Sequence, residues 1–536
     1  MNMTSRREFL QLIAAGGAGL ALFPRMSFAR ADGPWETVYP QILARIVPPK
    51  FKKKDYLITK FGARADGVTD CRAAINRAID ECSRKGGGRV VVPAGTFLTG
   101  AIRLKSNVNL HISKGATLKF STDSKAYMPI VHTRWEGMEL MHLSPLIYAY
   151  EQANIAITGE GTLDGQGKSF FWKWHGNPNY GGDPAKLSQK AARARLYEMM
   201  DNNVPVEKRI FGGPEDYLRP QFIQPYRCKN VLIEGVKIVD SPMWEVHPVL
   251  CENVTVRKLH IASHGPNNDG CDPESCKDVL IDECFFDTGD DCIAIKSGRN
   301  NDGRRINTPT ENIIVRNCTM KDGHGGITVG SEISGGVRNL FAHDNLLDSP
   351  DLWTAIRVKN NASRGGKLAN FYYKNNKVGQ VGRAVIEIDF NYEEGAKGAF
   401  TPEMKGLYID GLTCGSGNRA LDLQGFENAP IYDVVLKNCT FGEMKNPSVI
   451  KNVKGLRLGL LMDAGWGLPV EAETAAAVQA AARAFEAAGA IVEPMAPFST
   501  REMADGMDRF WRMRSWLDIS ALPSARQEKV LPYIRQ

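Results

Sequence analysis

The chain has 536 residues, of which 43% are hydrophobic and 24% are charged, a composition typical of soluble folded proteins. This length exceeds what one compact hydrophobic core usually serves, so the sequence predicts either an elongated fold or several domains. The formal net charge of +7 is too small to indicate nucleic-acid binding by itself. Basic residues near an acidic cluster would instead suit an anionic substrate.

The first 31 residues have the features of an export signal. Residues 5–11, SRREFLQ, closely match the twin-arginine pattern, and an apolar stretch at 10–23 precedes a small-x-small cleavage site at 27–29. That stretch is too short and too rich in glycine for a stable spanning helix. We therefore expect export by the twin-arginine pathway to the periplasm or the medium, without a stable membrane anchor. An ordinary N-terminal helix of a cytoplasmic protein is the less favoured alternative.

A short N-terminal cap is predicted over about residues 55–105. Asp70 is a plausible N-cap for a short helix that carries Ile75 and Ile79 on one face, and the glycines at 86–88 end it. A stack of open coils would expose a strand edge ready for pairing, so a cap is physically required.

The middle of the chain contains a degenerate repeat in which a polar residue precedes a short β-branched strand. The seven polar residues are Asn154, Asn230, Asn253, Asp278, Asn312, Asn339 and Asn370. Their intervals are mostly about 20 to 50 residues, which is typical of solenoids, and such strands must stack on their neighbours to bury one face. The sequence therefore predicts an all-β fold, a right-handed parallel β-helix, over residues 55–455.

About fifty residues, 168–224, interrupt this repeat, and they include a helix-like segment. A long excursion from a compact solenoid is usually a functional loop or a disordered one. Trp172, Trp174 and Tyr180 favour an ordered loop. At the sequence level each ring can equally face a carbohydrate or pack against the flank of the solenoid.

The eleven cysteines form no CxxC pair, so metal-ligand spacing is absent. Most lie in strand-like segments, which favours buried small apolar side chains over a disulfide framework. We expect neither a metal nor another cofactor.

Acidic residues gather between residues 265 and 330. Asp269 lies in NNDG, and Asp290 and Asp291 are adjacent in GDDC. Crowded carboxylates raise the pKa of one member, so that it stays protonated while its neighbours act as bases. Adjacent residues of a regular strand point to opposite faces. Asp290 and Asp291 can therefore share a cleft only if a turn interrupts the strand, and Gly289 favours such a turn.

Basic residues follow this acidic cluster. His324 lies in GHGG, and Arg357 and Lys359 are two residues apart, which places both on one face of a strand. An arginine and a lysine on one face suit a uronate carboxylate better than a neutral sugar. Lys296 points to the same side as Asp290 if strand alternation resumes, and it is a weaker candidate.

Read in order, the segments NND, GDD, GHG and RVK resemble the four motifs of the polygalacturonase family, glycoside hydrolase family 28. The usual forms are NTD, DD, GHG and RIK, so Asn268 and Val358 are departures. The resemblance covers roughly residues 55–455. It implies an inverting hydrolase in which Asp290 is the general acid, Asp269 and Asp291 hold the attacking water, and His324 tunes the acid. It also implies substrate contacts, for which the candidates are Arg357, Lys359, Lys296 and Asn267.

The predicted reaction is inverting hydrolysis of α-1,4-galacturonosyl bonds in polygalacturonate by a monomer. An exo mode is favoured because the insert at 168–224 could wall off one end of the groove, although endo enzymes also carry loops. Related activity on rhamnogalacturonan or xylogalacturonan stays open. So do a pectate lyase, in which three clustered aspartates would hold calcium, and a non-catalytic β-helical carbohydrate-binding protein or adhesin.

Residues 456–536 differ from the rest, because they contain neither asparagine nor cysteine. A strand, a helix at about 469–488 and a second strand predict a βαβ unit, which is foreign to a β-helix. This tail resembles a C-terminal fragment of amidase-signature enzymes, but the chain has no Gly/Ser-rich catalytic motif, which makes a cytosolic amidase an unfavoured alternative. We predict a non-catalytic appendage that is poorly packed or depends on a partner.

Overall fold

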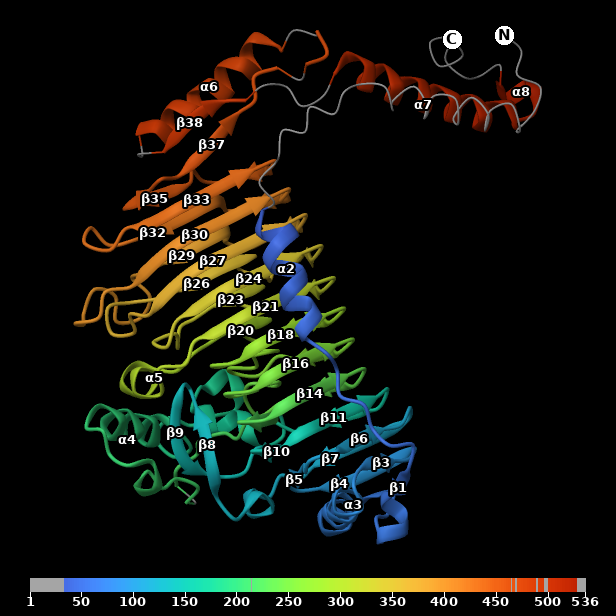
Figure 1. Ribbon diagram of the computed structural model, residues 1–536, viewed down its shortest axis with the longest axis vertical. Helices are drawn as coiled ribbons and strands as arrows, with labels where there is room; N and C mark the ends of the chain where they lie inside the picture. Colours follow the sequence, from blue (N-terminus) through green and yellow to red (C-terminus); the bar gives the residue numbers. More distant parts are fainter. Residues whose placement is uncertain are drawn as a thin grey trace. The chain divides into compact units, whose positions relative to one another are not determined.

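The computed structural model describes residues 33–527, except 214, 464, 468–469, 488–489 and 496–499. The predicted export signal lies outside the described residues. From Arg45 onward, successive strands stack as the coils of a parallel β-helix, as predicted (Figure 1). Helix α2 (Pro34–Arg45) precedes the coils in the chain, and most of it belongs to a separate compact unit that ends at Ala44. No described helix is long and apolar enough to cross a membrane.

The longest sheet has fifteen strands, each paired in parallel with its neighbour on the next coil. Its strands are β1 (Asp55–Leu57), β3 (Gly88–Val92), β6 (Val108–Ile112), β11 (Ala153–Gly159), β14 (Lys229–Glu234), β16 (Glu252–Arg257), β18 (Lys277–Asp282), β21 (Thr310–Arg316), β24 (Val337–His343), β27 (Lys367–Lys374), β30 (Glu403–Asp410), β33 (Ile431–Lys437), β36 (Val453–Lys454), β37 (Arg457–Leu460) and β38 (Ile491–Pro494).

A second parallel sheet has twelve strands and follows the first along each coil. Its strands are β2 (Asp66–Asp70), β4 (Gly95–Thr99), β7 (Ala116–Phe120), β12 (Thr162–Asp164), β15 (Lys237–Val239), β17 (His260–Ser263), β19 (Phe285–Thr288), β22 (Thr319–Met320), β25 (Leu346–Leu347), β28 (Lys377–Gln380), β31 (Thr413–Gly417) and β34 (Thr440–Met444).

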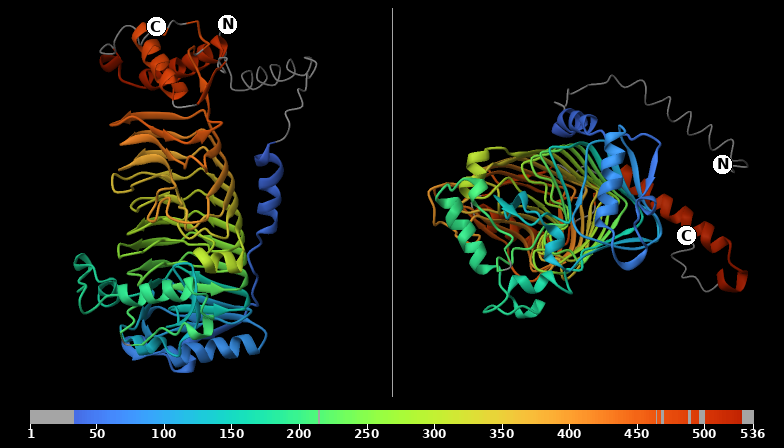
Figure 2. Two further views of the ribbon diagram at one scale, coloured as in Figure 1. Left: turned by 90° about the vertical axis from the view of Figure 1, so that its left-hand side faces the viewer. Right: turned by 90° about the horizontal axis from the view of Figure 1, so that it is seen from below.

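The third side of the coils is divided into a three-stranded and a six-stranded parallel sheet (Figure 2). The first contains β5 (Ile102–Arg103), β10 (Ile147–Tyr150) and β13 (Ile223–Tyr226). The second contains β20 (Ile293–Ile295), β23 (Ile327–Val329), β26 (Ile356–Lys359), β29 (Ala384–Asp389), β32 (Arg419–Gln424) and β35 (Val449–Lys451).

The repeat residues predicted from the sequence form a ladder at one corner of the coils. All seven have positive φ values, between 55° and 64°. Their side chains hydrogen-bond from coil to coil, as in the 2.8 Å contacts from Asn230 Nδ2 to Asn154 Oδ1 and from Asn253 Nδ2 to Asn230 Oδ1. Asparagine and aspartate tolerate this left-handed conformation better than most residues. An asparagine or aspartate at this position therefore lets the chain turn and also hydrogen-bonds the equivalent residue of the adjacent coil.

The interior is a continuous apolar core built from inward-facing strand residues. All eleven cysteines are unpaired, and ten of them are buried in this interior. Three form a column, in which the backbone N–H of Cys228 donates to Cys251 Sγ and that of Cys251 donates to Cys276 Sγ. The prediction that most cysteines are buried is confirmed.

The N-terminal cap contains η1 (Ile58–Phe61) and helix α3 (Arg72–Arg84), which buries Ile75 and Ile79 completely. The predicted N-cap is one residue too early. Cys71 occupies that position, while Asp70 ends β2 and its carboxylate accepts a 2.8 Å hydrogen bond from the Arg72 N–H. The aspartate still satisfies a free donor of the first helical turn, because its side chain reaches past Cys71.

The insert is ordered and contains η3 (Phe171–His175), η4 (Pro178–Tyr180), α4 (Lys190–Asp201) and η5 (Val206–Lys208). Trp172 and Trp174 are each only 7% exposed, so these two rings pack against protein, whereas Tyr180 is partly exposed. An antiparallel hairpin of β8 (Val131–Trp135) and β9 (Met138–His142), which the repeat pattern did not predict, lies nearby in Figure 1. Two short helices, η2 (Ser124–Tyr127) and α5 (Asn300–Ile306), complete the loops between coils.

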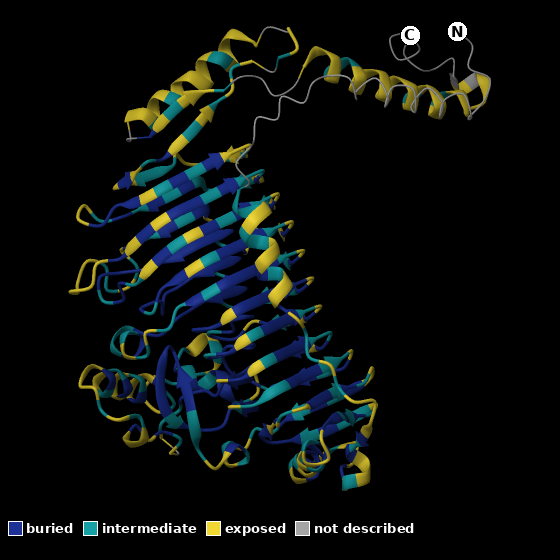
Figure 3. Cartoon of the chain, viewed as in Figure 1, coloured by how far each residue is buried: buried dark blue, intermediate teal, exposed yellow. Residues whose placement is uncertain are grey.

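The tail forms the predicted βαβ unit. Strand β37 pairs in parallel with β33, and β38 pairs with β37, so the unit continues the longest sheet of the β-helix. Helix α6 (Ala472–Ala487) connects the two strands, and α7 (Arg501–Ser520) and α8 (Ser524–Gln527) follow. Both α6 and α7 are largely exposed (Figure 3).

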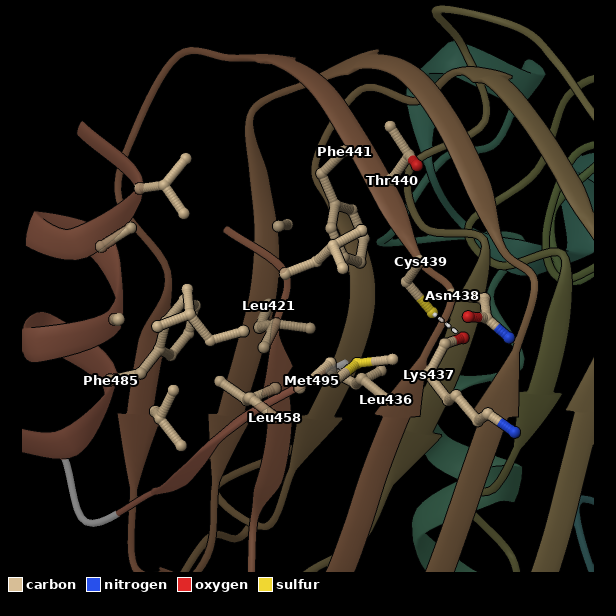
Figure 4. Close-up of a pocket in the computed structure, with 18 residues that line it drawn as sticks. Leu421, Leu436, Lys437, Asn438, Cys439, Thr440, Phe441, Leu458, Phe485 and Met495 are labelled. Atoms are coloured by element: carbon tan, nitrogen blue, oxygen red, sulfur yellow. Dashed lines mark hydrogen bonds between the residues drawn. The ribbon is translucent and has the colours of Figure 1, made fainter. Parts of the chain in front are cut away.

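An apolar cavity of about 710 Å³ separates α6 from the last coils (Figure 4). Phe485 of α6 and Leu436, Phe441 and Leu458 of the neighbouring strands line it. The tail therefore covers the last coil loosely, with an apolar gap between the two.

Candidate active site

The four sequence motifs come together because they occupy equivalent positions on neighbouring coils. Asp290 and Asp291 lie just before β20, His324 lies before β23, and Arg357 and Lys359 belong to β26. Strands β20, β23 and β26 are direct neighbours in the six-stranded sheet, and Cys271, two residues after Asp269, bridges to Ile293 of β20. Residues up to ninety positions apart in sequence are therefore brought to one place.

The three aspartates form a compact triad, in which one carboxylate oxygen of each lies within 4.8 Å of the others. Asp269 and Asp291 are buried, and Asp290 is partly exposed. The predicted interruption is present, because β19 ends at Thr288 and β20 starts only at Ile293. A Cβ on Gly289 would lie 2.5 Å from the Gly265 carbonyl oxygen, so this close approach of two loops requires glycine.

His324 controls the charge of one member of the triad. Its Nδ1 lies 3.0 Å from Asp290 Oδ1. Burial opposes the charged form of each partner, but their mutual hydrogen bond and attraction outweigh it, so the pKa of Asp290 is lowered and that of His324 is raised. Asp269 differs, because burial and the neighbouring charges of Asp290 and Asp272 raise its pKa well above the ordinary value. A proton shared by the triad of the free protein therefore favours Asp269.

The cations of β26 contact Asp291. Lys359 Nζ lies 2.6 Å from Asp291 Oδ2, and an Arg357 terminal nitrogen lies 3.8 Å from Oδ1. Thr328 donates a 3.1 Å hydrogen bond to the same carboxylate, and Arg357 Nε also donates to Glu387 at 2.7 Å. Sequence reasoning missed Thr328 and Glu387. They pair with Arg357 in strand register, and the irregular repeat spacing gave no means of aligning them.

Lys296 is buried next to the triad. It is 2% exposed, and its ammonium lies 3.8 Å from Asp269, 3.6 Å from Asp272 and 3.1 Å from Glu332. The ring of Trp244 is 4.5 Å from the same nitrogen. This environment differs from the predicted substrate-contacting role, because the cation is already surrounded by buried carboxylates.

The NND loop is held by the insert. Asn267 has a positive φ of 52°, and its Oδ1 accepts a 2.6 Å hydrogen bond from the buried Arg219. Asn268 is fully buried and accepts hydrogen bonds from the Ser263 hydroxyl and the Gly265 N–H. Trp172 donates from Nε1 to the Ser241 carbonyl at 2.7 Å. The insert therefore supports the backbone that carries Asp269.

The charge of the triad also acts on residues of the insert. The pKa of Tyr180 is raised by partial burial and by the charge of Asp290, and burial lowers the pKa of His175 to about 4. Tyr180 and His175 are in edge-to-face contact, with ring centroids 6.1 Å apart. The contact that places the insert against the site is the hydrogen bond from Arg219 to Asn267, in the loop that carries Asp269, one coil before Asp290.

Trp353 is a further residue near the triad that sequence reasoning missed. Trp353 stacks on His324 with a centroid distance of 3.8 Å and an interplanar angle of 22°. It fixes the plane of the imidazole whose Nδ1 contacts Asp290. The motif SPDLWTA gave no sign of this role, because only the coil stacking places Trp353 next to His324.

The charges around the triad suit acid–base chemistry. A cluster of three carboxylates can in principle bind a divalent cation. Here Lys359 already contacts Asp291, and Lys296 lies close to Asp269, so two lysines balance much of the negative charge. Paired carboxylates of unequal pKa are the groups that glycosidic cleavage uses as acid and base.

Comparisons with known proteins show the family of the chain. The family model of glycosyl hydrolases family 28 matches residues 214–459, and a model described as rhamnogalacturonase A/epimerase, pectate lyase-like, matches residues 57–126. A probable polygalacturonase of Vitis vinifera is 26% identical over 423 residues, covering 75% of this chain and 78% of the relative. An exo-poly-alpha-D-galacturonosidase of Dickeya chrysanthemi is 26% identical over 362 residues, covering 63% of this chain and 57% of the relative.

The solved structure of a hyperthermoactive exopolygalacturonase from Thermotoga maritima is 43% identical to this chain, with a TM-score of 0.74. The match covers 77% of this chain and 92% of that one. This degree of identity extends over almost the whole of the Thermotoga enzyme. Together with four motifs that converge on one carboxylate triad, it shows that the chain is a glycoside hydrolase and belongs to glycosyl hydrolases family 28.

Proposed function

We propose that this protein is an exo-acting polygalacturonase that hydrolyses α-1,4-galacturonosyl bonds of polygalacturonate with inversion. The observation that carries the proposal is the triad of Asp269, Asp290 and Asp291 beside the cations Arg357 and Lys359. Carboxylates supply the acid and the base, and the cations favour a substrate that is itself an acid. The matched enzymes of Thermotoga maritima and Dickeya chrysanthemi are both described as exo-acting on galacturonans.

In the proposed mechanism Asp290 protonates the leaving oxygen, and Asp269 and Asp291 orient and deprotonate a water. Asp290 is the one member of the triad that is partly exposed. In the free protein, however, His324 favours the ionised form of Asp290, while Asp269 favours the protonated form. Asp290 must therefore receive the proton when substrate binds, and the short distances within the triad allow that transfer. His324 then stabilises the charge that develops on Asp290.

The stereochemical outcome is a separate part of this proposal. Carboxyl groups of inverting pairs are typically roughly 6.5–9.5 Å apart, which exceeds the 4.8 Å limit on the nearest triad oxygens. Inversion therefore requires the water to be held by the Asp269–Asp291 pair, rather than between two widely separated groups. Proton NMR of the first sugar released distinguishes the two outcomes: the β anomer of galacturonate supports inversion, and the α anomer overturns it.

The exo mode rests on the insert. Arg219 donates to Asn267 in the loop of Asp269, Trp172 donates to Ser241, and the pKa of Tyr180 is raised partly by the charge of Asp290. A rigid wall next to the acid leaves room for a chain end and obstructs a continuous polymer.

The decisive experiment digests polygalacturonate with the purified protein in excess EDTA and identifies products by mass. Saturated galacturonate or digalacturonate from the start of the reaction supports the proposal, and a ladder of saturated oligomers would move it to endo hydrolysis. Unsaturated products that need calcium would indicate a lyase, and binding without turnover would indicate a carbohydrate-binding protein. Asp290→Asn should lower kcat by about 10²- to 10⁴-fold, the range for a lost general acid. Asp80→Asn, at an exposed position of α3, is the matched control.

We further propose that the protein is exported by the twin-arginine pathway to the periplasm or the medium and acts there as a monomer without a membrane anchor. The twin-arginine pattern at residues 5–11 supports this proposal. Replacing Arg6 and Arg7 with lysine should retain the protein in the cytoplasm, which fractionation detects. Sedimentation of the mature protein tests its oligomeric state.

The tail is proposed to be a fragment similar to amidase-signature enzymes that lacks their chemistry. The βαβ unit of β37, α6 and β38 supports the likeness, and the chain contains no Gly/Ser-rich catalytic motif. Hydrolysis of simple amides by the purified protein would overturn this proposal.

A further inference from the structure

Three planar side chains form a column that begins at the proposed acid. His324 contacts Asp290, Trp353 stacks on His324 at 3.8 Å, and the guanidinium carbon of Arg383 lies 3.7 Å from the centroid of the Trp353 ring. The column is tied to the backbone, because Trp353 N–H donates to the Gly323 carbonyl and Arg383 N–H donates to the Trp353 carbonyl. The three side chains therefore occupy equivalent places on consecutive coils.

Arg383 differs from the other cations near the cleft. Arg357 pairs with Glu387, Lys359 pairs with Asp291, and Lys296 lies among three carboxylates. Arg299 and Arg364 likewise pair with glutamates. In contrast, no carboxylate of the described residues lies within ion-pair distance of Arg383, whose side chain is exposed. Its guanidinium is held in place by the indole ring, and its hydrogen-bond donors are available to a ligand.

The direction of the column matches the proposed path of the substrate. The insert contacts the loop of Asp269 through the hydrogen bond from Arg219 to Asn267, one coil before Asp290, whereas Trp353 and Arg383 lie on later coils. Adjacent coils are separated by one strand spacing, so Arg383 lies two coils, roughly 10 Å, beyond the coil of His324. A polygalacturonate molecule whose end rests against the insert would place its first two sugars across the triad and its third near Arg383.

We propose that Arg383, held flat on Trp353, binds the carboxylate of the third galacturonate from the chain end. This subsite rests on the proposed exo-polygalacturonase function and deepens it, because it makes recognition of the departing chain specific for a uronate. A planar guanidinium fixed on an aromatic face is suited to bind a carboxylate, since little side-chain entropy remains to be lost on binding.

The test compares digalacturonate, which ends before Arg383, with trigalacturonate, which reaches it. Arg383→Gln should raise KM for trigalacturonate by about 10-fold or more, the ratio expected for one hydrogen bond to a charged group. It should leave kcat and the kinetics of digalacturonate unchanged. Methyl esterification of the third carboxylate should raise the KM of the wild-type protein for trigalacturonate to that of Arg383→Gln. Arg84→Gln, which replaces an exposed arginine of α3, is the matched control and should change the kinetics on neither substrate.

Two outcomes would overturn the subsite and can be told apart. If wild-type protein cleaves both oligomers but Arg383→Gln affects them equally or not at all, Arg383 does not bind the third sugar, although the proposed function stands. If wild-type protein releases galacturonate from neither oligomer, the proposed function fails and the subsite fails with it.

Discussion

His324 Nδ1 lies 3.0 Å from Asp290 Oδ1, and this contact raises the pKa of the histidine while lowering that of the aspartate. The attraction between them is complete only while His324 is protonated and Asp290 is ionised. On the basic side it is lost as the pH rises through the raised pKa of His324, which exceeds the ordinary value of about 6.5. On the acidic side it is lost as the pH falls through the lowered pKa of Asp290.

We therefore predict that kcat/KM on polygalacturonate falls on the basic side with an apparent pKa above about 6.5. His324→Gln should lower kcat by about 10²-fold, the lower end of the range for acid–base groups, and should abolish that basic limb. The measurement is the pH dependence of kcat/KM for both proteins. A variant that keeps the same basic limb would assign the titration to another group.

Lys296→Met should destabilise the fold strongly. Removing the ammonium leaves Asp269, Asp272 and Glu332 buried without their shared cation. Breaking a buried ion pair in this way typically costs about 3–5 kcal/mol. Lys105→Met is the matched control, because its pair with Asp80 is exposed and should contribute about 1 kcal/mol or less. Urea unfolding measures both. A Lys296→Met protein of unchanged stability would show that the carboxylates beneath the triad are protonated.

Gly265→Ala should reduce activity by displacing the loop of Asp269. A Cβ at this position would lie 2.2 Å from Trp172 Nε1, and the indole is fixed by its hydrogen bond to Ser241. Adding Trp172→Phe removes the clashing nitrogen and should restore part of the activity, which a double-mutant cycle measures. Gly506→Ala, in α7 with no atom within 4 Å of its added Cβ, should have no effect on activity. If the activity losses of Gly265→Ala and Trp172→Phe simply add in the double variant, the proposed clash is ruled out.

The two halves of the tail should differ in their contribution to stability. A chain ending at residue 455 loses β37, which covers the edge of β33, and exposes Leu436 and Phe441 to water. We expect a lower Tm and aggregation, because an open parallel edge invites pairing. A chain ending at residue 499 loses α7, none of whose residues is buried, and should keep its Tm. Limited proteolysis should cleave α7 first. An α7 that resists the protease would contradict the prediction of a loosely packed tail.

The sequence alone was sufficient to predict the fold, and it located the four motifs that the structure brings together. Residues such as Asn230 and Asn253 indicate a solenoid, because they recur where the coils turn through the left-handed conformation, which asparagine tolerates better than most residues. The aspartates, His324, Arg357 and Lys359 were identified because their motifs are short and local. Asp70 was misplaced by one residue, since its side chain reaches the helix from the preceding strand.

Only the tertiary structure decided what each residue touches across the coils. Lys296 was expected to contact substrate, yet its side chain is buried and its ammonium lies among Asp269, Asp272 and Glu332. Trp353 and Arg383 carry no motif and acquire a role only where coil stacking aligns them with His324. Local patterns determine where a chain turns. The register between coils, which depends on the length of every intervening loop, determines which side chains meet.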